Sequence, residues 1–440
     1  MKDSSEPKRK MDKVHILNNY NLLRKEIFIM RIGMVLEGVF PPDIRVEKES
    51  RRLIDCGHEV FLLSAWKEGL LKEDKIDGVQ ITRIVADYSL INKIFMDLIF
   101  RISFVNPFWK NHIGTFIKNN KIDVLHIHDL PLVKTALMIA EKNSIPIIAD
   151  LHENYPEAIR QWRSGPRSPL TLNTLYEKVV EFLQSPSRFD RMARSILPRV
   201  SHIIAVVDEG KFFYSSQYGI PENKISVIMN TEDTDYFDTI PIQKTLVEKF
   251  KDNFVISYVG GFGPHRGIDT AIRMMPSVIK TIPHAKLLLI GGKGNPSFEK
   301  TMRDLCVELN LENNVEFTGW VDFSLVPTYI AASSVCLIPH HASGHTDSTI
   351  PHKLFQYMAM KKPIVTTDCI PLKRIVEETS SGIVVPSGDA GAMAKAIIDI
   401  YNNPNLARQY GENGRKAVET KYNWKNDSEN LIQIYQELSK

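Results

Sequence analysis

One pattern repeats through most of the sequence: a short run of β-branched apolar residues, a loop with Gly, Pro, Asp or His, and then ten or more residues with helical periodicity. Alternating strands and helices of this length predict βαβ units, in which a helix connects two parallel strands. We therefore expect an α/β protein with parallel sheets. Ligands of such sheets bind at the carboxyl ends of the strands, so functional residues are sought in the loops that follow the strands.

The expected strands form two series, separated by a polar stretch after Met229. The first series comprises residues 29–36, 59–63, 79–84, 124–128, 147–151 and 203–207. The second comprises residues 255–259, 286–290, 315–318, 335–338, 364–367 and 383–385. A chain of 440 residues is also too long for one ordinary hydrophobic core. We therefore expect two Rossmann-like, doubly wound parallel-sheet domains, residues 30–230 and residues 231–423, which face each other across a cleft.

The charge of the chain is concentrated at its start. Residues 1–29 hold seven Lys or Arg and four Asp or Glu, a difference of three that equals the whole net charge of +3. This segment lacks the apolar core and cleavage site of a signal peptide, which indicates a disordered basic tail or an upstream translation start. The remaining chain is neutral on average, which argues against a nucleic-acid partner.

Apolar runs and cysteines exclude two further classes of protein. No apolar run approaches the ~20 residues that a membrane-spanning helix needs. The 4 cysteines are far apart and form no CxxC pair, so neither a zinc cage nor a disulfide framework is indicated. A reducing cytoplasm fits this cysteine usage best.

Two segments of the first domain are rich in basic and apolar residues. Residues 88–121 hold five Lys or Arg and one acidic residue. Residues 160–199 hold eight Lys or Arg and three acidic residues. We interpret them as amphipathic helices with their basic faces in water. The alternative is docking on an anionic membrane or a lipid-phosphate acceptor, for which basic faces beside aromatic and leucine-rich faces are suited.

A glycine-rich loop, residues 260–267, lies between an expected strand and a helix that begins near Ile268. Gly261 and Gly263 allow a ligand to approach the backbone, and the helix N-terminus supplies unpaired N–H groups for phosphate. Arg266 adds a positive charge that can neutralise a leaving diphosphate. We expect a phosphate-binding loop; the alternative is a glycine-rich turn with a solvated arginine.

Ionisable side chains end two strands of the first domain. His152 and Glu153 follow the strand 147–151, and His126 and His128 end the strand 124–128. Histidines two residues apart on a strand point the same way, but the sequence shows no third ligand beside them. No metal site is therefore expected.

The loop after the first strand begins a helix. Asp43 is expected to cap that helix, and Arg45 lies in its first turn. A cation there opposes the helix dipole unless an anion lies nearby. The loop with Asp43 and Arg45 is therefore expected to face a phosphate group of the acceptor or donor.

A further helix N-terminus is expected near Pro351, between a loop containing Thr349 and a strand from residue 364. Lys353 lies close to this N-terminus, and Gln356 lies one turn further on. An amide can hydrogen-bond sugar hydroxyls both as donor and as acceptor. This segment is expected to contribute to the same cleft.

Together these segments resemble the retaining glycosyltransferase family 4, whose members have the GT-B fold, from about residue 30 to the C-terminus. In the first domain the resemblance rests on PDIRVEKES at 42–50, DVLHIHD at 123–129 and VIMN at 227–230. In the second domain, GGFGPHRG at 260–267 is similar to the family motif GRLxxxKG, and FQYMAMKKPIV at 355–365 is similar to LEAMACGxPVV. The resemblance implies that a final helix, within residues 424–440, returns to the first domain.

The resemblance implies that a nucleotide diphosphate sugar binds mainly to the second domain, with Arg266 on the diphosphate, Gln356 near the ribose and His152 beside the transferred sugar. It implies transfer with retention, in which the departing phosphate oxygen takes the acceptor proton, and no bound metal or other cofactor. The family arginine of GRL is Gly261 here, and the paired glutamates spaced eight apart fall on Ser348 and Gln356. Both carboxylates of that pair are therefore missing.

The expected reaction is transfer of a sugar to a glycan or lipid-phosphate-linked acceptor, in cell-surface polysaccharide biosynthesis. The expected location is the cytoplasm, with peripheral contact to the inner face of the cell membrane. One alternative is a non-hydrolysing nucleotide-sugar epimerase, but carboxylates are scarce near Arg266 and Gln356. Another is a non-catalytic, nucleotide-binding scaffold of a polysaccharide assembly, since a fold does not fix a function.

Overall fold

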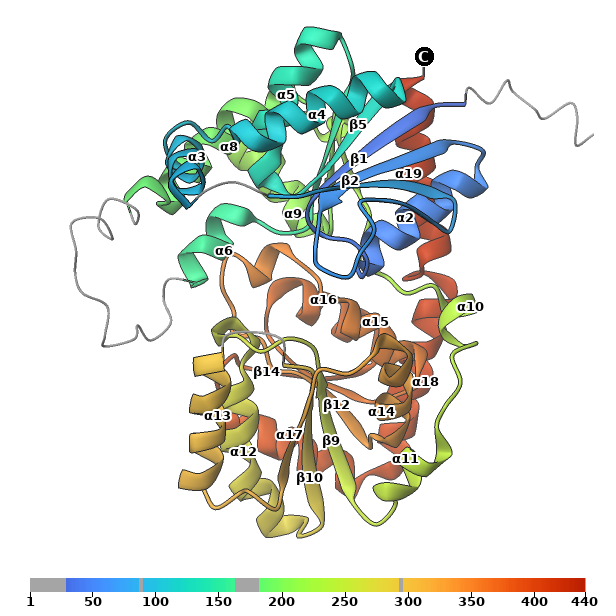
Figure 1. Ribbon diagram of the computed structural model, residues 1–440. Helices are drawn as coiled ribbons and strands as arrows, with labels where there is room; N and C mark the ends of the chain where they lie inside the picture. The colour runs from blue at the N-terminus through green and yellow to red at the C-terminus, as the bar shows by residue number, and fades with distance from the viewer. Residues whose placement is uncertain (1–28, 87–89, 163–181, 293–295, 440) are drawn as a thin grey trace, which may run out of the picture.

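The computed structural model describes residues 29–86, 90–162, 182–292 and 296–439, which form two α/β domains stacked one above the other in Figure 1. The basic tail expected over residues 1–29 lies outside the described residues, apart from Ile29. The middle of the basic segment 160–199, residues 163–181, lies outside them as well.

The first domain is built on an eight-stranded sheet in which all neighbours are parallel except β3 and β4. In spatial order the strands are β3 (Glu73–Ile76), β4 (Val79–Ile84), β2 (Glu59–Ala65), β1 (Arg31–Val39), β5 (Val124–His128), β6 (Ile147–Leu151), β7 (His202–Ala205) and β8 (Ile225–Val227). The bounds of β5 and β6 are those predicted. The sequence missed β3 and β8, because β3 is a short charged edge strand and β8 has only 3 residues.

The second domain has a six-stranded sheet that is parallel throughout. In spatial order its strands are β11 (Val315–Gly319), β10 (Ala285–Ile290), β9 (Phe254–Val259), β12 (Val335–Ile338), β13 (Ile364–Thr367) and β14 (Gly382–Val385). The chain winds outward from β9 to β11 and then returns to β12 on the other side of β9. The carboxyl ends of β9 and β12 therefore form a topological switch point, where ligands of such sheets bind.

Helices cover both faces of each sheet (Figure 1). The described helices of the first domain are α2 (Ile44–Asp55), α3 (Leu90–Ser103), α4 (Pro107–Asn120), α5 (Leu130–Asn143), α6 (Tyr155–Trp162), α8 (Pro186–Ile196), α9 (Asp208–Tyr218) and α19 (Trp424–Leu438). Helices α4, α5, α8 and α9 form one hydrophobic core with one face of the sheet, and α2 and α19 form another with the opposite face.

In the second domain α12, α13 and α17 pack on one face of the sheet, and α14, α15 and α16 pack on the other. Its helices are α10 (Thr234–Phe237), α11 (Lys244–Lys249), α12 (Ile268–Thr281), α13 (Pro296–Glu308), α14 (Val326–Ala332), α15 (His352–Ala359), α16 (Ile370–Thr379), α17 (Ala390–Asn402) and α18 (Pro404–Thr420). Helix α12 starts at the predicted residue, and α15 starts one residue after Pro351.

The chain passes between the domains twice, and the two passages lie side by side. Trp424 donates its backbone N–H to the carbonyl of Glu232 at 3.1 Å, and Glu232 and Asn423 form a β-bridge. Helix α19 then packs Leu431 and Tyr435 into the core of the first domain. Within the described ranges, no helix is both long and apolar enough to cross a membrane.

Candidate functional site

A cleft of about 420 Å³ lies between the domains, at the switch point of the second sheet. The first domain contributes four of its lining residues: Ile44, His152, Glu153 and Asn230. The second domain contributes the others: Val259, Gly260, Gly261, His265, Arg266, Phe323, Val326, His340, His345, Thr346, Thr349, Ile350, Pro351, His352, Lys353 and Gln356.

Most of the residues predicted from the sequence are brought together here. Six of them line the cleft: His152, Gly261, Arg266, Thr349, Lys353 and Gln356. The predicted donor residues Gly263 and Ser348 do not line it. Gly263 accepts the backbone N–H of Arg266 at 2.9 Å, and Ser348 is buried with its hydroxyl donating to the carbonyl of Gly344 at 2.7 Å. Both residues therefore shape loops beside the cleft.

The glycine-rich loop after β9 is fixed by close backbone packing. Gly267 has φ +63°, and a Cβ atom at this position would lie 1.7 Å from the carbonyl oxygen of Pro339. Only glycine fits this approach between the loops that follow β9 and β12. The hydroxyl of Tyr258 donates to the carbonyl of Gly261 at 2.8 Å. The loop thereby places Arg266 and the N-terminus of α12 beside the cleft.

Lys353 brings a second cation to the same place. Its Nζ lies 3.8 Å from the centre of the Tyr258 ring, and the side chain is buried. Within the described parts of the chain, this Nζ has no hydrogen-bond partner. Burial and the neighbouring charge of Arg266 hold the pKa of Lys353 well below its usual range. An anion bound in the cleft would supply the missing partner.

Four histidines also line the cleft, and the sequence reasoning missed them: His265, His340, His345 and His352. They lie in loops or turns or at the start of a helix, and although His340 stands next to His341, no spacing typical of a binding motif marked any of them. Burial and Arg266 lower the pKa of His265 to about 2, and burial holds the pKa of His340 well below its usual range. These two rings are therefore neutral near pH 7 and can form hydrogen bonds without adding charge.

His152 enters the cleft from the end of β6 and is positively charged. Its Nε2 lies 3.0 Å from an oxygen of Asp150, and its Nδ1 lies 3.6 Å from Asp129. Burial alone would lower its pKa, but the carboxylates of Asp129 and Asp150 raise the pKa of His152 to about 10. The ring is therefore an imidazolium near pH 7.

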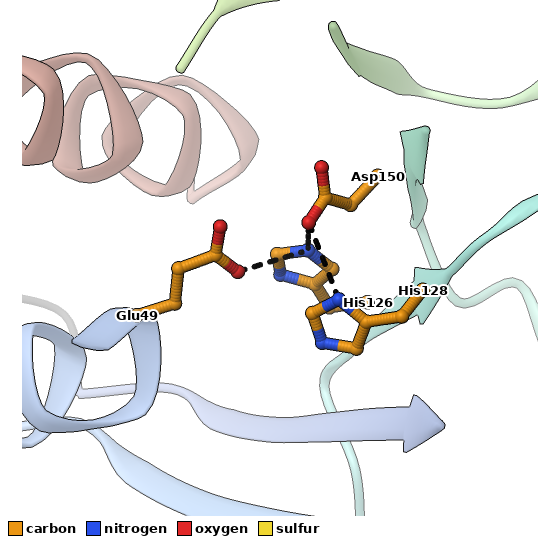
Figure 2. Close-up of side chains that lie close together, drawn as sticks. All are labelled: Glu49, His126, His128 and Asp150. Carbon is orange, nitrogen blue, oxygen red and sulfur yellow. Dashed lines mark hydrogen bonds and ion pairs between the residues drawn. The ribbon is translucent and has the colours of Figure 1, made fainter. Parts of the chain in front are cut away.

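Four buried polar side chains form a cluster next to His152: Glu49, His126, His128 and Asp150 (Figure 2). His128 Nδ1 lies 3.2 Å from Asp150, and His126 Nε2 lies 3.6 Å from Glu49. All four side chains are buried. The sequence showed no third ligand beside the two histidines, but the fold supplies two carboxylates from α2 and β6. These residue types could hold a metal ion.

Arg45 already supplies positive charge to this cluster. Its Nη2 lies 2.8 Å from Asp150 and its Nε lies 3.1 Å from Glu49, in an almost fully buried ion pair. Asp43 caps α2, as predicted, by accepting the N–H groups of Arg45 and Val46. Asp150 thus provides an anion beside Arg45, and of the loop expected to face phosphate it is Ile44, not Asp43 or Arg45, that lines the cleft. Arg45 thus lies beside both carboxylates, and His152 lies beside that of Asp150. Among the described residues, neither oxygen of Glu49 has a hydrogen-bond partner.

The two domains also contact each other around the cleft. His345 Nε2 lies 3.1 Å from Glu153, and the hydroxyl of Ser343 donates to Gln161 at 3.0 Å. Further out, Arg374 of α16 forms a two-point ion pair with Glu209 of α9, at 2.7 and 3.0 Å. Polar contacts therefore hold the second-domain loops against the first domain.

Family models match both domains. Residues 44–236 match the model described as Glycosyltransferase Family 4, and residues 241–417 match Glycosyl transferases group 1. Among solved structures, a sucrose-phosphate synthase from Thermosynechococcus elongatus covers 93% of this chain and 99% of its own, with a TM-score of 0.74 and 18% identity. Anabaena HepE, solved in complex with UDP-glucose, gives a TM-score of 0.70 and 15% identity, covering 93% of this chain and 99% of its own. Both share the fold.

Curated relatives agree with these matches. An uncharacterized glycosyltransferase of Methanocaldococcus jannaschii is 23% identical over 56% of this chain, and the match spans 61% of that relative's length. A phosphatidyl-myo-inositol mannosyltransferase of Mycolicibacterium smegmatis is 22% identical over 93% of this chain and 94% of its own. With both domains matched, the chain belongs to the glycosyl transferases group 1 of glycosyltransferase family 4 and is a glycosyltransferase with the GT-B fold.

Proposed function

We propose that this chain transfers a sugar, with retention of configuration, from a nucleotide diphosphate sugar to a glycan or lipid-linked acceptor. The observation that carries the proposal is the pair of cations, Arg266 and Lys353, beside the open backbone of Gly260 and Gly261 at the switch point. The buried ammonium of Lys353 lies against Gly260, next to the position where the family arginine is replaced by Gly261. A diphosphate would pair with both cations.

In the proposed reaction the acceptor hydroxyl attacks the face of the sugar that the diphosphate leaves. The bond from the anomeric carbon to the phosphate oxygen breaks, and that oxygen takes the acceptor proton. Arg266, Lys353 and the N-terminus of α15 stabilise the charge that develops on the diphosphate, which is electrostatic catalysis. His152 lies on the opposite wall of the cleft. Its Nε2 is paired with Asp150, so Nδ1, which is 3.6 Å from Asp129, is the atom that can donate a hydrogen bond to the transferred sugar.

We further propose that the reaction needs no metal ion or other cofactor. Support comes from Arg266 and Lys353, which supply at the diphosphate the positive charge that a metal would otherwise bring. Treatment with EDTA is expected to leave the rate of transfer unchanged. A rate that falls with EDTA and returns with Mg²⁺ would contradict this.

The proposed acceptor belongs to cell-surface polysaccharide biosynthesis, with the protein in the cytoplasm and peripherally on the inner face of the cell membrane. Large apolar side chains are exposed on one side of the first domain: Phe95, Leu98 and Ile102 of α3, and Phe182. Arg188 of α8 holds the end of α3 by donating to the carbonyls of Arg101 and Ile102 at 2.7 Å each. Exposed apolar side chains beside basic residues suit a membrane interface.

The test is calorimetry with UDP-, GDP-, ADP- and CDP-sugars on the wild type, on Arg266→Ala and on Arg303→Ala. Arg303 is a matched control, because it is half-exposed on α13 and pairs with Glu299. Selective binding is expected for one nucleotide, with a loss of about tenfold or more in Arg266→Ala and none in Arg303→Ala. Binding without any transfer would favour the non-catalytic scaffold, and no binding at all would overturn the proposed donor site.

A further inference from the structure

Gln356 is held from behind by a carboxylate that does not line the cleft. Its Nε2 donates to Oε2 of Glu232 at 3.0 Å, across 124 residues of sequence. Both side chains are buried, with 4% of Gln356 and 2% of Glu232 exposed. Gln356 lines the cleft, whereas Glu232 lies in the first passage between the domains.

This contact fixes which end of the amide faces the ligand. A carboxylate only accepts hydrogen bonds, so Nε2 is the end of the amide that faces Glu232. The carbonyl oxygen Oε1 is then the end left for the cleft. Gln356 thus presents its oxygen as a hydrogen-bond acceptor to the ligand, while its NH2 group donates to Glu232.

Glu232 is itself held in place. Its Oε1 accepts the backbone N–H of Asp233 at 3.2 Å, and its carbonyl accepts the N–H of Trp424 at 3.1 Å. The next-door residue Thr231 donates its hydroxyl to Asp427 of α19. The carboxylate therefore belongs to the paired interdomain passages, whose backbones are hydrogen-bonded to each other.

We propose that Glu232 is a positioning residue, which orients the Gln356 amide so that its oxygen accepts a hydrogen bond from a ribose hydroxyl of the bound nucleotide. The proposal rests on the proposed function, because it assigns the nucleoside end of the same donor site. The family glutamate is replaced by Gln356 here, and in this proposal Glu232 supplies the negative charge beside that position. The chemical class recognised is a ribonucleoside diphosphate, in preference to its 2′-deoxy form.

A reciprocal exchange tests this orientation. Gln356→Glu alone would set two buried carboxylates about 3.0 Å apart, where they repel each other or must share a proton. Adding Glu232→Gln reverses the pair: the new amide donates to the new carboxylate, and the second carboxylate oxygen faces the cleft. The same acceptor is then presented to the ribose. Glu232→Gln alone gives two amides, which can pair in either orientation.

The measurement is the affinity of UDP, GDP, ADP and CDP and of their 2′-deoxy forms for the wild type, the two single variants and the double variant. The wild type is expected to favour the ribose form by about tenfold, the loss typical of a buried group left unpaired. Glu232→Gln should reduce this preference, and Gln356→Glu should weaken binding of the ribose form about tenfold or more. The double variant should recover both the affinity and the ribose preference.

Three outcomes would overturn the inference: an unchanged ribose preference in Glu232→Gln, a wild type without such a preference, or a double variant no better than Gln356→Glu. Glu232→Gln retains size and hydrogen bonding, so it decides the matter even where Gln356→Glu fails to fold. A merely structural role for Glu232 would lower the melting temperature without changing the ratio of ribose to deoxyribose affinity. A wild type that binds none of UDP, GDP, ADP and CDP would reject the donor site itself, which is a separate failure.

Discussion

At the scale of single residues, the cleft and the polar cluster beside it combine charged groups that are paired within the protein with a buried lysine that has no hydrogen-bond partner among the described residues. The His152 imidazolium is balanced by Asp129 and Asp150, and Arg45 is balanced by Asp150 and Glu49. Lys353 has no such partner in the described parts of the chain. A buried unpaired ammonium costs folding free energy, and functional sites commonly retain such costs because the ligand compensates them.

Replacing Lys353 by methionine is therefore expected to stabilise the ligand-free protein by about 1 kcal/mol or more and to weaken donor binding about tenfold. The pKa of Lys353 is lowered on folding, so between that pKa and the unfolded value of about 10.4 the unfolded chain binds more protons. Wild-type stability from this group then rises with pH, and the advantage of the variant shrinks toward pH 10. Chemical denaturation at several pH values measures this.

Lys362→Met is the matched control. Its side chain is partly buried, and its Nζ donates to the carbonyls of Ala331 and Ser333 at 2.8 and 2.7 Å. This variant loses both bonds and is expected to be destabilised. If both methionine variants lower stability equally, Lys353 has a partner in solution and the interpretation of it as a phosphate ligand loses its basis.

At the scale of elements, helix α19 connects the second domain to the polar cluster under His152. The hydroxyl of Tyr435 on α19 lies 2.7 Å from Nδ1 of His126, which leaves His126 Nε2 facing Glu49 and Asp150. The same helix buries Trp424 and Leu431 in the core that it forms with α2 and the sheet of the first domain. The helix therefore fixes both the packing of the first domain and the ring orientation of one member of the cluster.

Tyr435→Phe keeps the packing of α19 and removes only this hydrogen bond. We expect a loss of about 1–3 kcal/mol in the free energy of unfolding, because a buried ring nitrogen is left unpaired. Tyr236→Phe is the control, since Tyr236 is 49% exposed and its variant should change stability by less than about 0.5 kcal/mol. Equal, small effects in urea denaturation would show that the His126 contact contributes nothing.

At the scale of the whole molecule, the ion pair between Glu209 and Arg374 joins the two domains outside the cleft. Closure of a transferase cleft excludes water, which would otherwise accept the sugar in place of the acceptor. Neither residue of the pair lines the donor cleft.

Glu209→Gln is expected to raise the ratio of donor hydrolysis to transfer about two- to fivefold, the range of a partly exposed ion pair. Glu141→Gln is the control, because Glu141 forms a similar two-point pair with Arg199 within the first domain. Product analysis with and without acceptor measures the ratio. The same ratio in both variants would show that the interdomain pair does not govern closure.

Patterns local in the sequence determined the α/β class, the strands β5, β6, β12 and β13, the start of α12 and the cap Asp43, because periodicity, glycine turns and capping act within a few residues. They also located Arg266 in the loop after β9 and Lys353 at the start of α15. Tertiary structure alone decided which charges meet. Arg45 pairs with Asp150 across 105 residues and Gln356 with Glu232 across 124, and no local pattern encodes such distances. The packing of the sheets also sets the pKa values of His152 and Lys353, because desolvation and neighbouring charges act on these side chains only in the folded protein.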